Sequence, residues 1–128
     1  MTREDRELLL KDLGGRLPYG VKILDIPANV VGKLFLISTT DTVQYETTDD
    51  TGVQTLYNIK PYLFPLSSMT EEEQRTLDSM CNGVEMVSRL SGLKMFDKAF
   101  NWLNENHFDY RGLIEKGLAI DATGLNIY

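Results

Sequence analysis

The sequence predicts a single α+β domain over residues 1–128: an N-terminal helix, a four-stranded antiparallel meander or small barrel, and then about three helices. Two observations predict this class. Runs rich in branched and aromatic residues, separated by turn clusters, fill the stretch from Tyr19 to Ile59. Apolar residues at helical spacing mark the segments on either side of it. A chain of 128 residues suits one domain with a core that needs no disulfide or metal.

The first helix is predicted over residues 2–17. Thr2 or Asp5 can cap its start, and the pair Gly14-Gly15 predicts a stop. Its leucines recur at near-helical spacing and predict a packing face: Leu9, Leu10, Leu13 and Leu17.

Four strands are predicted within residues 19–26, 31–39, 43–48 and 53–59. The last two flank Asp49–Gly52, a cluster of turn residues, and predict a hairpin. In the second arm, alternate residues should share one face: Val53, Thr55, Tyr57 and Ile59.

Pro61 is expected to end the last strand, because proline cannot donate to the ladder. Residues 61–68 are therefore predicted as an extended connector rather than as a strand. The apolar residues of this connector are expected to lie along the surface of the core: Tyr62, Leu63, Phe64 and Leu66. The alternative is an exposed segment in which Tyr62, Leu63 and Phe64 are candidate partner-binding residues, since exposed apolar patches mark partner sites.

A second helix is predicted to begin near Thr70, because Thr70 and Glu73 have the spacing of a capping box. Its apolar stripe would bury Cys81 as a small hydrophobic residue. Residues 85–94 are compatible with either helix or loop. The clearest helical pattern covers residues 96–107, and a short helix is predicted from Tyr110 to Lys116. The face expected to pack in the helix over 96–107 consists of Phe96, Ala99, Phe100, Leu103 and His107.

The segment HFDYRGL, residues 107–113, gathers side chains that are common in active sites: His107, Asp109, Tyr110 and Arg111. As a catalytic cluster, His107 would need an orienting carboxylate, and Asp109 can serve only if the local backbone is extended. As a joint, His107 would close a helix whose negative end favours a protonated imidazole, and Asp109 would cap the next helix through the amides of Arg111 or Gly112. The joint is the favoured interpretation, and Arg111 is the residue that it explains least.

Motifs for metals and cofactors are missing from the sequence. The chain has one histidine and one cysteine, with none of the usual metal-ligand spacings, and no phosphate-binding glycine loop or nucleophile elbow. We therefore expect no metal, no cofactor and no identifiable catalytic residue.

The net charge of −6 disfavours nucleic acid as a partner. Between Lys33 and Lys60 the chain has no basic residue at all. An alternative hypothesis retains a small barrel that binds nucleic acid through Arg16, Lys22, Lys33 and nearby aromatic residues. The single cysteine, the lack of a secretory signal and the lack of a long apolar run lead us to expect a cytoplasmic protein without a membrane segment.

Three strings resemble a family of small proteins without an assigned activity, encoded by gut Bacteroides species and their phages or prophages. The strings are LLLKDLGGRLPYGV (8–21), IKPYLFPLSSMTEEE (59–73) and NHFDYRGLIEKGLAIDATGLNIY (106–128). The chain departs from the family at Gly14-Gly15, where a bulkier or cysteine-containing pair is expected. The resemblance implies a cytoplasmic protein from a phage- or prophage-related locus, and it supplies no catalytic residues.

The leading functional hypothesis is a non-enzymatic protein that binds another protein through a sheet edge or through the PYLFP connector. One alternative is the small nucleic-acid-binding barrel. The other is an enzyme with a site around His107, Asp109 and Arg111. The sequence does not indicate the identity of the partner or the oligomeric state.

Overall fold

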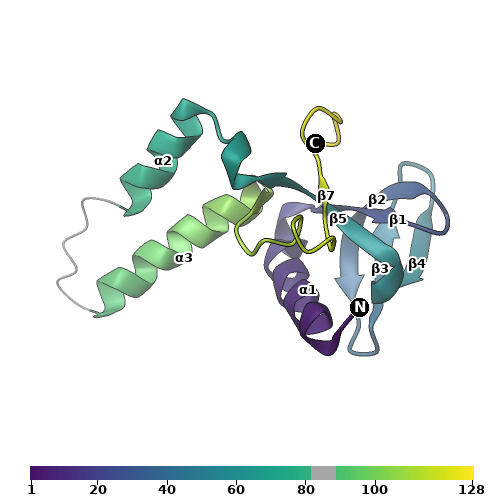
Figure 1. Ribbon diagram of the computed structural model, residues 1–128. Helices are drawn as coiled ribbons and strands as arrows, with labels where there is room; N and C mark the ends of the chain where they lie inside the picture. The colour runs from purple at the N-terminus through teal and green to yellow at the C-terminus, as the bar shows by residue number, and fades with distance from the viewer. Residues whose placement is uncertain (82–88) are drawn as a thin grey trace.

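The computed structural model describes residues 1–81 and 89–128, with side chains omitted for residues 89–92. An N-terminal helix, a mostly antiparallel sheet and two further helices confirm the predicted α+β class (Figure 1). The helices are α1 (Arg3–Arg16), α2 (Glu71–Cys81) and α3 (Arg89–Glu105). The strands are β1 (Lys22–Asp25), β2 (Val30–Ile37), β3 (Thr42–Glu46), β4 (Thr51–Thr55), β5 (Ile59–Pro65), β6 (Phe108–Asp109) and β7 (Ile120–Asp121).

Helix α1 begins with a capping box, in which the Thr2 hydroxyl accepts from the Asp5 amide at 3.1 Å and the Asp5 carboxylate accepts from the Thr2 amide at 3.4 Å. The predicted stop at Gly14-Gly15 was wrong, because the helix continues to Arg16. Arg16 donates from Nε to the Asp12 carboxylate one turn earlier at 2.8 Å, and both side chains are buried. This buried pair stabilises the last turn despite the two glycines.

The sheet has the strand order β4-β3-β2-β1-β5-β6, with β7 also paired to β5. The predicted four-stranded meander is present as β1 to β4. The prediction that an extended connector follows it was wrong, because residues 59–65 form the strand β5. This strand pairs antiparallel with β1 and parallel with β6 and β7. The Ile26 amide donates to the Asn58 carbonyl, so Ile26 and Asn58 are a hydrogen-bonded pair. Hydrogen-bonded and non-hydrogen-bonded pairs alternate along an antiparallel ladder, so Ile23 and Pro61, three positions further on, are a non-hydrogen-bonded pair. The missing N–H of Pro61 therefore costs the β1–β5 ladder nothing.

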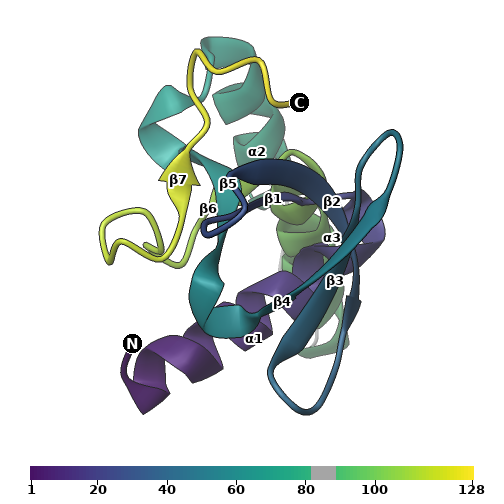
Figure 2. The same ribbon diagram turned by 90° about the vertical axis from the view of Figure 1, so that its right-hand side faces the viewer.

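The core lies between α1 and the inner face of the curved sheet, with α1 crossing one side of it (Figure 2). In α1 the buried leucines are Leu9 and Leu13, half of the predicted face. The predicted hairpin face was wrong beyond β4, because a 3-10 turn at Leu56–Asn58 interrupts the alternation between β4 and β5. Val53 and Tyr57 are exposed, whereas Ile59, after the turn, is buried.

A buried tyrosine organises the middle of the sheet. The Tyr45 hydroxyl donates to the buried Asp25 carboxylate at 2.6 Å, and this bond together with burial raises the pKa of Tyr45 to about 12. The ring lies over Gly32 and Gly52, where any Cβ would overlap it. These two glycines are thus required by a close approach, as for aromatic rings that cover glycines in other sheets.

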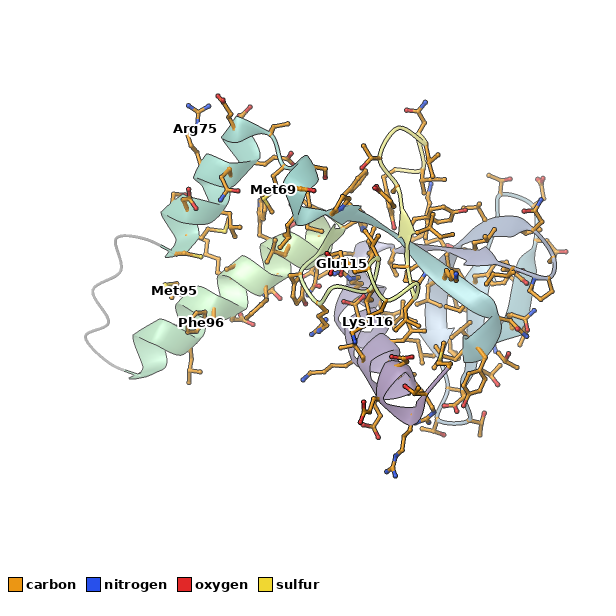
Figure 3. The ribbon with its side chains drawn as sticks, in the orientation of Figure 1. Met69, Arg75, Met95, Phe96, Glu115 and Lys116 are labelled. Atoms are coloured by element: carbon orange, nitrogen blue, oxygen red, sulfur yellow. The ribbon has the colours of Figure 1, made fainter. Side chains whose placement is uncertain are left out.

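Helices α2 and α3 form a hairpin that extends away from the sheet (Figure 1). The predicted capping box at α2 is confirmed, since Thr70 and Glu73 exchange hydrogen bonds of 3.0 and 3.1 Å. None of the residues in α2 is buried, and Cys81 is exposed, so its predicted burial was wrong. Figure 3 shows Arg75 on the side of α2 away from α3. The main packing partner of α2 is α3.

Helix α3 begins at Arg89, so residues 89–94 of the ambiguous stretch are helical, and the preceding residues 85–88 lie outside the described part of the chain. The third helix predicted from Tyr110 to Lys116 was wrong. Residues 113–117 form turns, in which Gly117 donates to Ile114 and Leu118 donates to Leu113. The positive φ of Gly112 and Gly117 on either side limits the segment to this short length.

Candidate functional site

The segment HFDYRGL is a joint between α3 and the turns that follow β6. Asp109 caps it, but its partners lie two residues further on than predicted: its oxygens accept from the amides of Leu113 and Ile114, each at 3.0 Å. This double acceptance occupies both oxygens of a buried carboxylate. The predicted capping role is therefore present, although what it caps is a turn.

Arg111 contacts α1 across nearly the whole length of the sequence. Its Nη1 donates to Asp12 Oδ1 at 2.9 Å, while Asp12 Oδ2 accepts from Arg16. Arg16 in turn donates from Nη2 to the carbonyl of Phe108 at 2.6 Å. One buried carboxylate thus joins two guanidinium groups, and this explains the position of Arg111 without any catalytic role.

Tyr110 lies against the same two cations. The guanidinium carbon of Arg111 lies 4.7 Å from the centre of its ring, and that of Arg16 lies 5.3 Å away. The Tyr110 hydroxyl donates to Asn104 Oδ1 at 2.9 Å. Cation–π contacts of this kind stabilise a joint and fix its geometry.

The four predicted cluster residues do not converge on one pocket. Asp109 and Tyr110 line a surface pocket beside the turns, whereas His107 lines a different cavity on the other side of β6. Asp109, Tyr110 and Arg111 each already have partners of their own. The acid–base arrangement considered for His107 and Asp109 is therefore not formed.

The His107 cavity has a volume of about 530 Å³ and lies where α2, α3, β5 and the last residues meet. This volume is within the range of small-ligand sites. Its aromatic lining comes from Phe64, Phe108, Tyr128 and His107 itself, and its charged lining is Glu73 and Glu105.

His107 has three unusual properties. Its backbone is left-handed with φ +63°, which is costly for a residue with a Cβ. Its ring stacks on Tyr128 with the two centres 3.6 Å apart and the planes at 11°. Its Nδ1 is buried without a hydrogen-bond partner, one of two such side-chain atoms in the described part of the chain. Strain and an unsatisfied polar atom at a cavity are common features of functional sites.

The predicted protonation of His107 was wrong. Burial lowers the pKa of His107 to about 4, and the positive charges of Arg16 and Lys22 contribute in the same direction. These effects outweigh the attraction of the helix end, so the imidazole is neutral at pH 7.

The candidate partner-binding residues of the connector have been placed in β5. Tyr62 and Leu63 are buried, and Phe64 is half-buried against Phe108 and Tyr128. The proposal that they form an exposed binding segment was wrong, because β5 has strand neighbours on both edges. Phe64 lines the His107 cavity.

The basic patch considered for nucleic acid is reduced to two lysines, Lys22 and Lys33, which lie opposite each other on β1 and β2 and line one surface pocket together with Glu46. Arg16 is fully buried, and Lys22 donates from Nζ to the carbonyl of Ile127 at 2.7 Å. Lys33 is exposed. Among the described residues, Lys33 is the one of the three whose side chain is exposed and makes no ion pair or hydrogen bond.

The free edge of the sheet is β4. The Thr47 amide donates to the Asp50 carbonyl, and the Leu56 amide donates to the Asp41 carbonyl. Because hydrogen-bonded and non-hydrogen-bonded pairs alternate in an antiparallel ladder, the backbone N–H and C=O groups of Thr51, Val53 and Thr55 point away from β3. The Thr51 amide already donates to Asp50 Oδ1 at 2.7 Å, and the Thr55 amide donates to Gln54 Oε1 at 2.9 Å. The edge predicted as a binding site is therefore partly closed by its own side chains.

A row of exposed apolar residues lies along α3 instead. Leu93, Phe96 and Phe100 are 65%, 48% and 45% exposed, whereas Ala99 and Leu103 face the body and are buried. The prediction that Phe96 and Phe100 pack in the core was wrong. A signal was present in the sequence: the apolar residues of α3 span more of the helix than a single buried face requires.

The described residues contain no group of three or more His, Cys, Asp and Glu side chains arranged to hold a metal ion. Within the same residues, no helix has the length and apolar character needed to cross a bilayer. Comparisons of the chain with protein-family models, curated proteins and solved structures gave no match.

Proposed function

We propose that the protein is a non-enzymatic interaction module that binds another protein through the row Leu93, Phe96 and Phe100 on α3. The observation that carries this proposal is the exposure of all three side chains on a helical hairpin that extends from the body. Their spacing of i, i+3 and i+7 is the pattern with which a helix anchors in the apolar groove of a partner.

The size and continuity of these three side chains favour a binding site over incidental exposure of apolar residues. Scattered single apolar residues are ordinary on protein surfaces, but a contiguous row that contains two phenylalanines marks a contact site. Phe100 also lies against the Tyr110 ring at 5.1 Å, so the end of the row nearest the body is held in place. A partly rigid row loses less entropy on binding.

The experiment compares three forms of the chain as bait in extracts: wild type, the double variant Leu93→Ser/Phe96→Ser, and Val53→Ser. Val53 is 62% exposed on the sheet and is the matched control for loss of an exposed apolar side chain. Phe100 is left unchanged because it packs on Tyr110. We expect a partner that wild type and Val53→Ser retain and the double variant loses.

Sedimentation of the purified forms runs in parallel, so that a second copy of the chain is also detected as a partner. Equal retention of every partner by all three forms, with identical sedimentation, contradicts the proposal. Circular dichroism of the double variant checks that α3 still forms.

The cellular setting is a further part of this proposal. The single cysteine supports the cytoplasm, and the resemblance to proteins of gut Bacteroides and their phages supports a phage- or prophage-related locus. Sequencing of the neighbouring genes tests the second point.

A further inference from the structure

We propose that the cavity beside His107 binds an organic cation, an ammonium or guanidinium group on an apolar body, either free or as a lysine or arginine side chain of a peptide. This site is separate from the row on α3, so the inference goes beyond the proposed interaction function.

The charge of the lining determines the sign of the ligand. Glu73 and Glu105 line the cavity, and no lysine or arginine is among the described residues that do so. Two positive charges act on the His107 imidazole, those of Arg16 and Lys22, and neither residue lines the cavity. Both are held by other groups: Arg16 is paired with the Asp12 carboxylate, and Lys22 Nζ donates to the Ile127 carbonyl. The charged residues that do line the cavity are both carboxylates, so the lining favours a cationic ligand.

The aromatic lining suits the same ligand. Phe64 lies between Phe108 and Tyr128, with ring centres 6.2 and 5.9 Å away, and His107 stacks on Tyr128. The faces of aromatic rings carry partial negative charge and bind ammonium and guanidinium groups. Aromatic rings combined with carboxylates form the usual site for an organic cation with an apolar body.

The wall of the cavity is held rigid before any ligand arrives. The Tyr128 hydroxyl donates to the Tyr62 carbonyl at 2.7 Å and accepts from the Lys22 amide at 2.9 Å. The His107 carbonyl accepts from the Phe64 amide at 2.8 Å, which fixes the left-handed residue to β5. A site whose rings are already positioned binds a small ligand at lower entropic cost.

The test uses three probes of one shape and different charge: 2-phenylethylammonium, 2-phenylethanol and 3-phenylpropionate. A short neutral peptide with one central arginine represents the side-chain source. Trp102, the only tryptophan, stacks on Phe108 at 5.7 Å and reports binding by fluorescence. Shifts of the His107 and Tyr128 ring signals in NMR spectra show whether the probe binds in this cavity. We expect millimolar or tighter binding of the cation, weaker binding of the alcohol, and the weakest binding of the anion.

Two double variants test the carboxylates. Glu73→Gln/Glu105→Gln removes both charges from the cavity, and we expect it to weaken cation binding by about fivefold. Glu72→Gln/Glu115→Gln makes the same change of charge at exposed positions outside the cavity and should leave the affinity unchanged. Added salt should weaken the wild type more than the Glu73/Glu105 variant.

Equal or tighter binding of the anion overturns the inference, as does an unchanged affinity in the Glu73/Glu105 variant. A lack of any shift at Trp102, His107 or Tyr128 with all four probes overturns it too. If the peptide binds more tightly than the free cation, the natural ligand is a side chain; the reverse order assigns a small molecule. None of these results depends on the α3 row.

Discussion

Asp12 and Arg111 stand 99 positions apart in the chain and are joined by a hydrogen-bonded ion pair of 2.9 Å. The same carboxylate binds Arg16 at 2.8 Å, and its own exposure is zero. Two cations from different elements therefore depend on one buried anion, which connects α1 to the segment after β6. We therefore expect the loss of folding free energy on removing Asp12 or Arg111 to depend on how deeply each side chain and its remaining partner are buried.

Asp12→Ala should destabilise the fold by about 3–5 kcal/mol, because it leaves the fully buried Arg16 without its counterion. Arg111→Ala should cost less, about 1–2 kcal/mol, since Asp12 then still binds Arg16. Urea unfolding measures both. Glu7→Ala is the control, because it breaks the exposed pair with Arg3 and should cost less than about 1 kcal/mol. A cost for Asp12→Ala no greater than that for Glu7→Ala contradicts this account.

Gly52→Ala should destabilise the sheet by about 1–3 kcal/mol, because its Cβ would overlap the Tyr45 ring. Tyr45→Leu in the same chain should relieve most of that cost, so the two changes are expected to be non-additive in a double-mutant cycle. Gly14→Ala is the control: a Cβ there meets nothing, and the gain in helix propensity should stabilise α1 by up to about 1 kcal/mol. Additive effects of Gly52→Ala and Tyr45→Leu would show that the ring does not need the glycine.

The free energy of unfolding should fall as the pH drops from about 6.5 toward 4. The pKa of His107 is lowered from 6.5 to about 4 in the folded protein, so in this window the unfolded chain binds a proton that the folded chain does not. Below about pH 4 both states are protonated and this contribution levels off. The lowered pKa values of Asp25, Asp41 and Asp121 reduce stability only below about pH 5, where the carboxylates of the unfolded chain begin to bind protons, so the His107 contribution is read between pH 6.5 and 5.

Urea unfolding at pH 7, 6 and 5 measures this dependence. His107→Asn removes the imidazole but keeps a residue type that tolerates the left-handed backbone. We expect the variant to lose most of the decline between pH 6.5 and 5. The same decline in wild type and variant would assign it to another group.

Cys81 should react with a thiol reagent in the native protein at a rate close to that in urea, because its side chain is exposed at the end of α2. Mass spectrometry of the modified chain measures the rate. Protection in the native state would mean that this face of α2 is covered in solution.

Features of the fold that depend on local patterns could be predicted from the sequence. The cap at Thr2, the capping box at Thr70, the four meander strands and the cap at Asp109 each depend on neighbouring residues. Features that depend on distant contacts could not. β5 is a strand because β6 and β7 pair with it from far along the chain, and Arg16 is buried because Asp12 and Phe108 accept its hydrogen bonds.

The candidate site shows the same division. His107 was singled out by residue type, but its cavity depends on Phe64, Glu73 and Tyr128, three distant positions that no motif connects. Phe96 and Phe100 of the row on α3 are predicted from the sequence to pack in the core, because a helical pattern shows which residues share a face and leaves open what covers that face. The cavity that the sequence did not predict and the exposure of residues predicted to be buried both follow from the tertiary arrangement.

The parallel pairing of β5 with β6 and β7 also affects the order in which the protein matures. Tyr62 and Leu63 acquire their partners only when Ile120 and Asp121 have been synthesised, so the nascent chain exposes one edge of its sheet until then. Pairing over such long sequence separations slows folding, and it leaves the half-made chain open to association with other chains. Two short strands that are made long after the meander therefore complete the sheet that the first strands began.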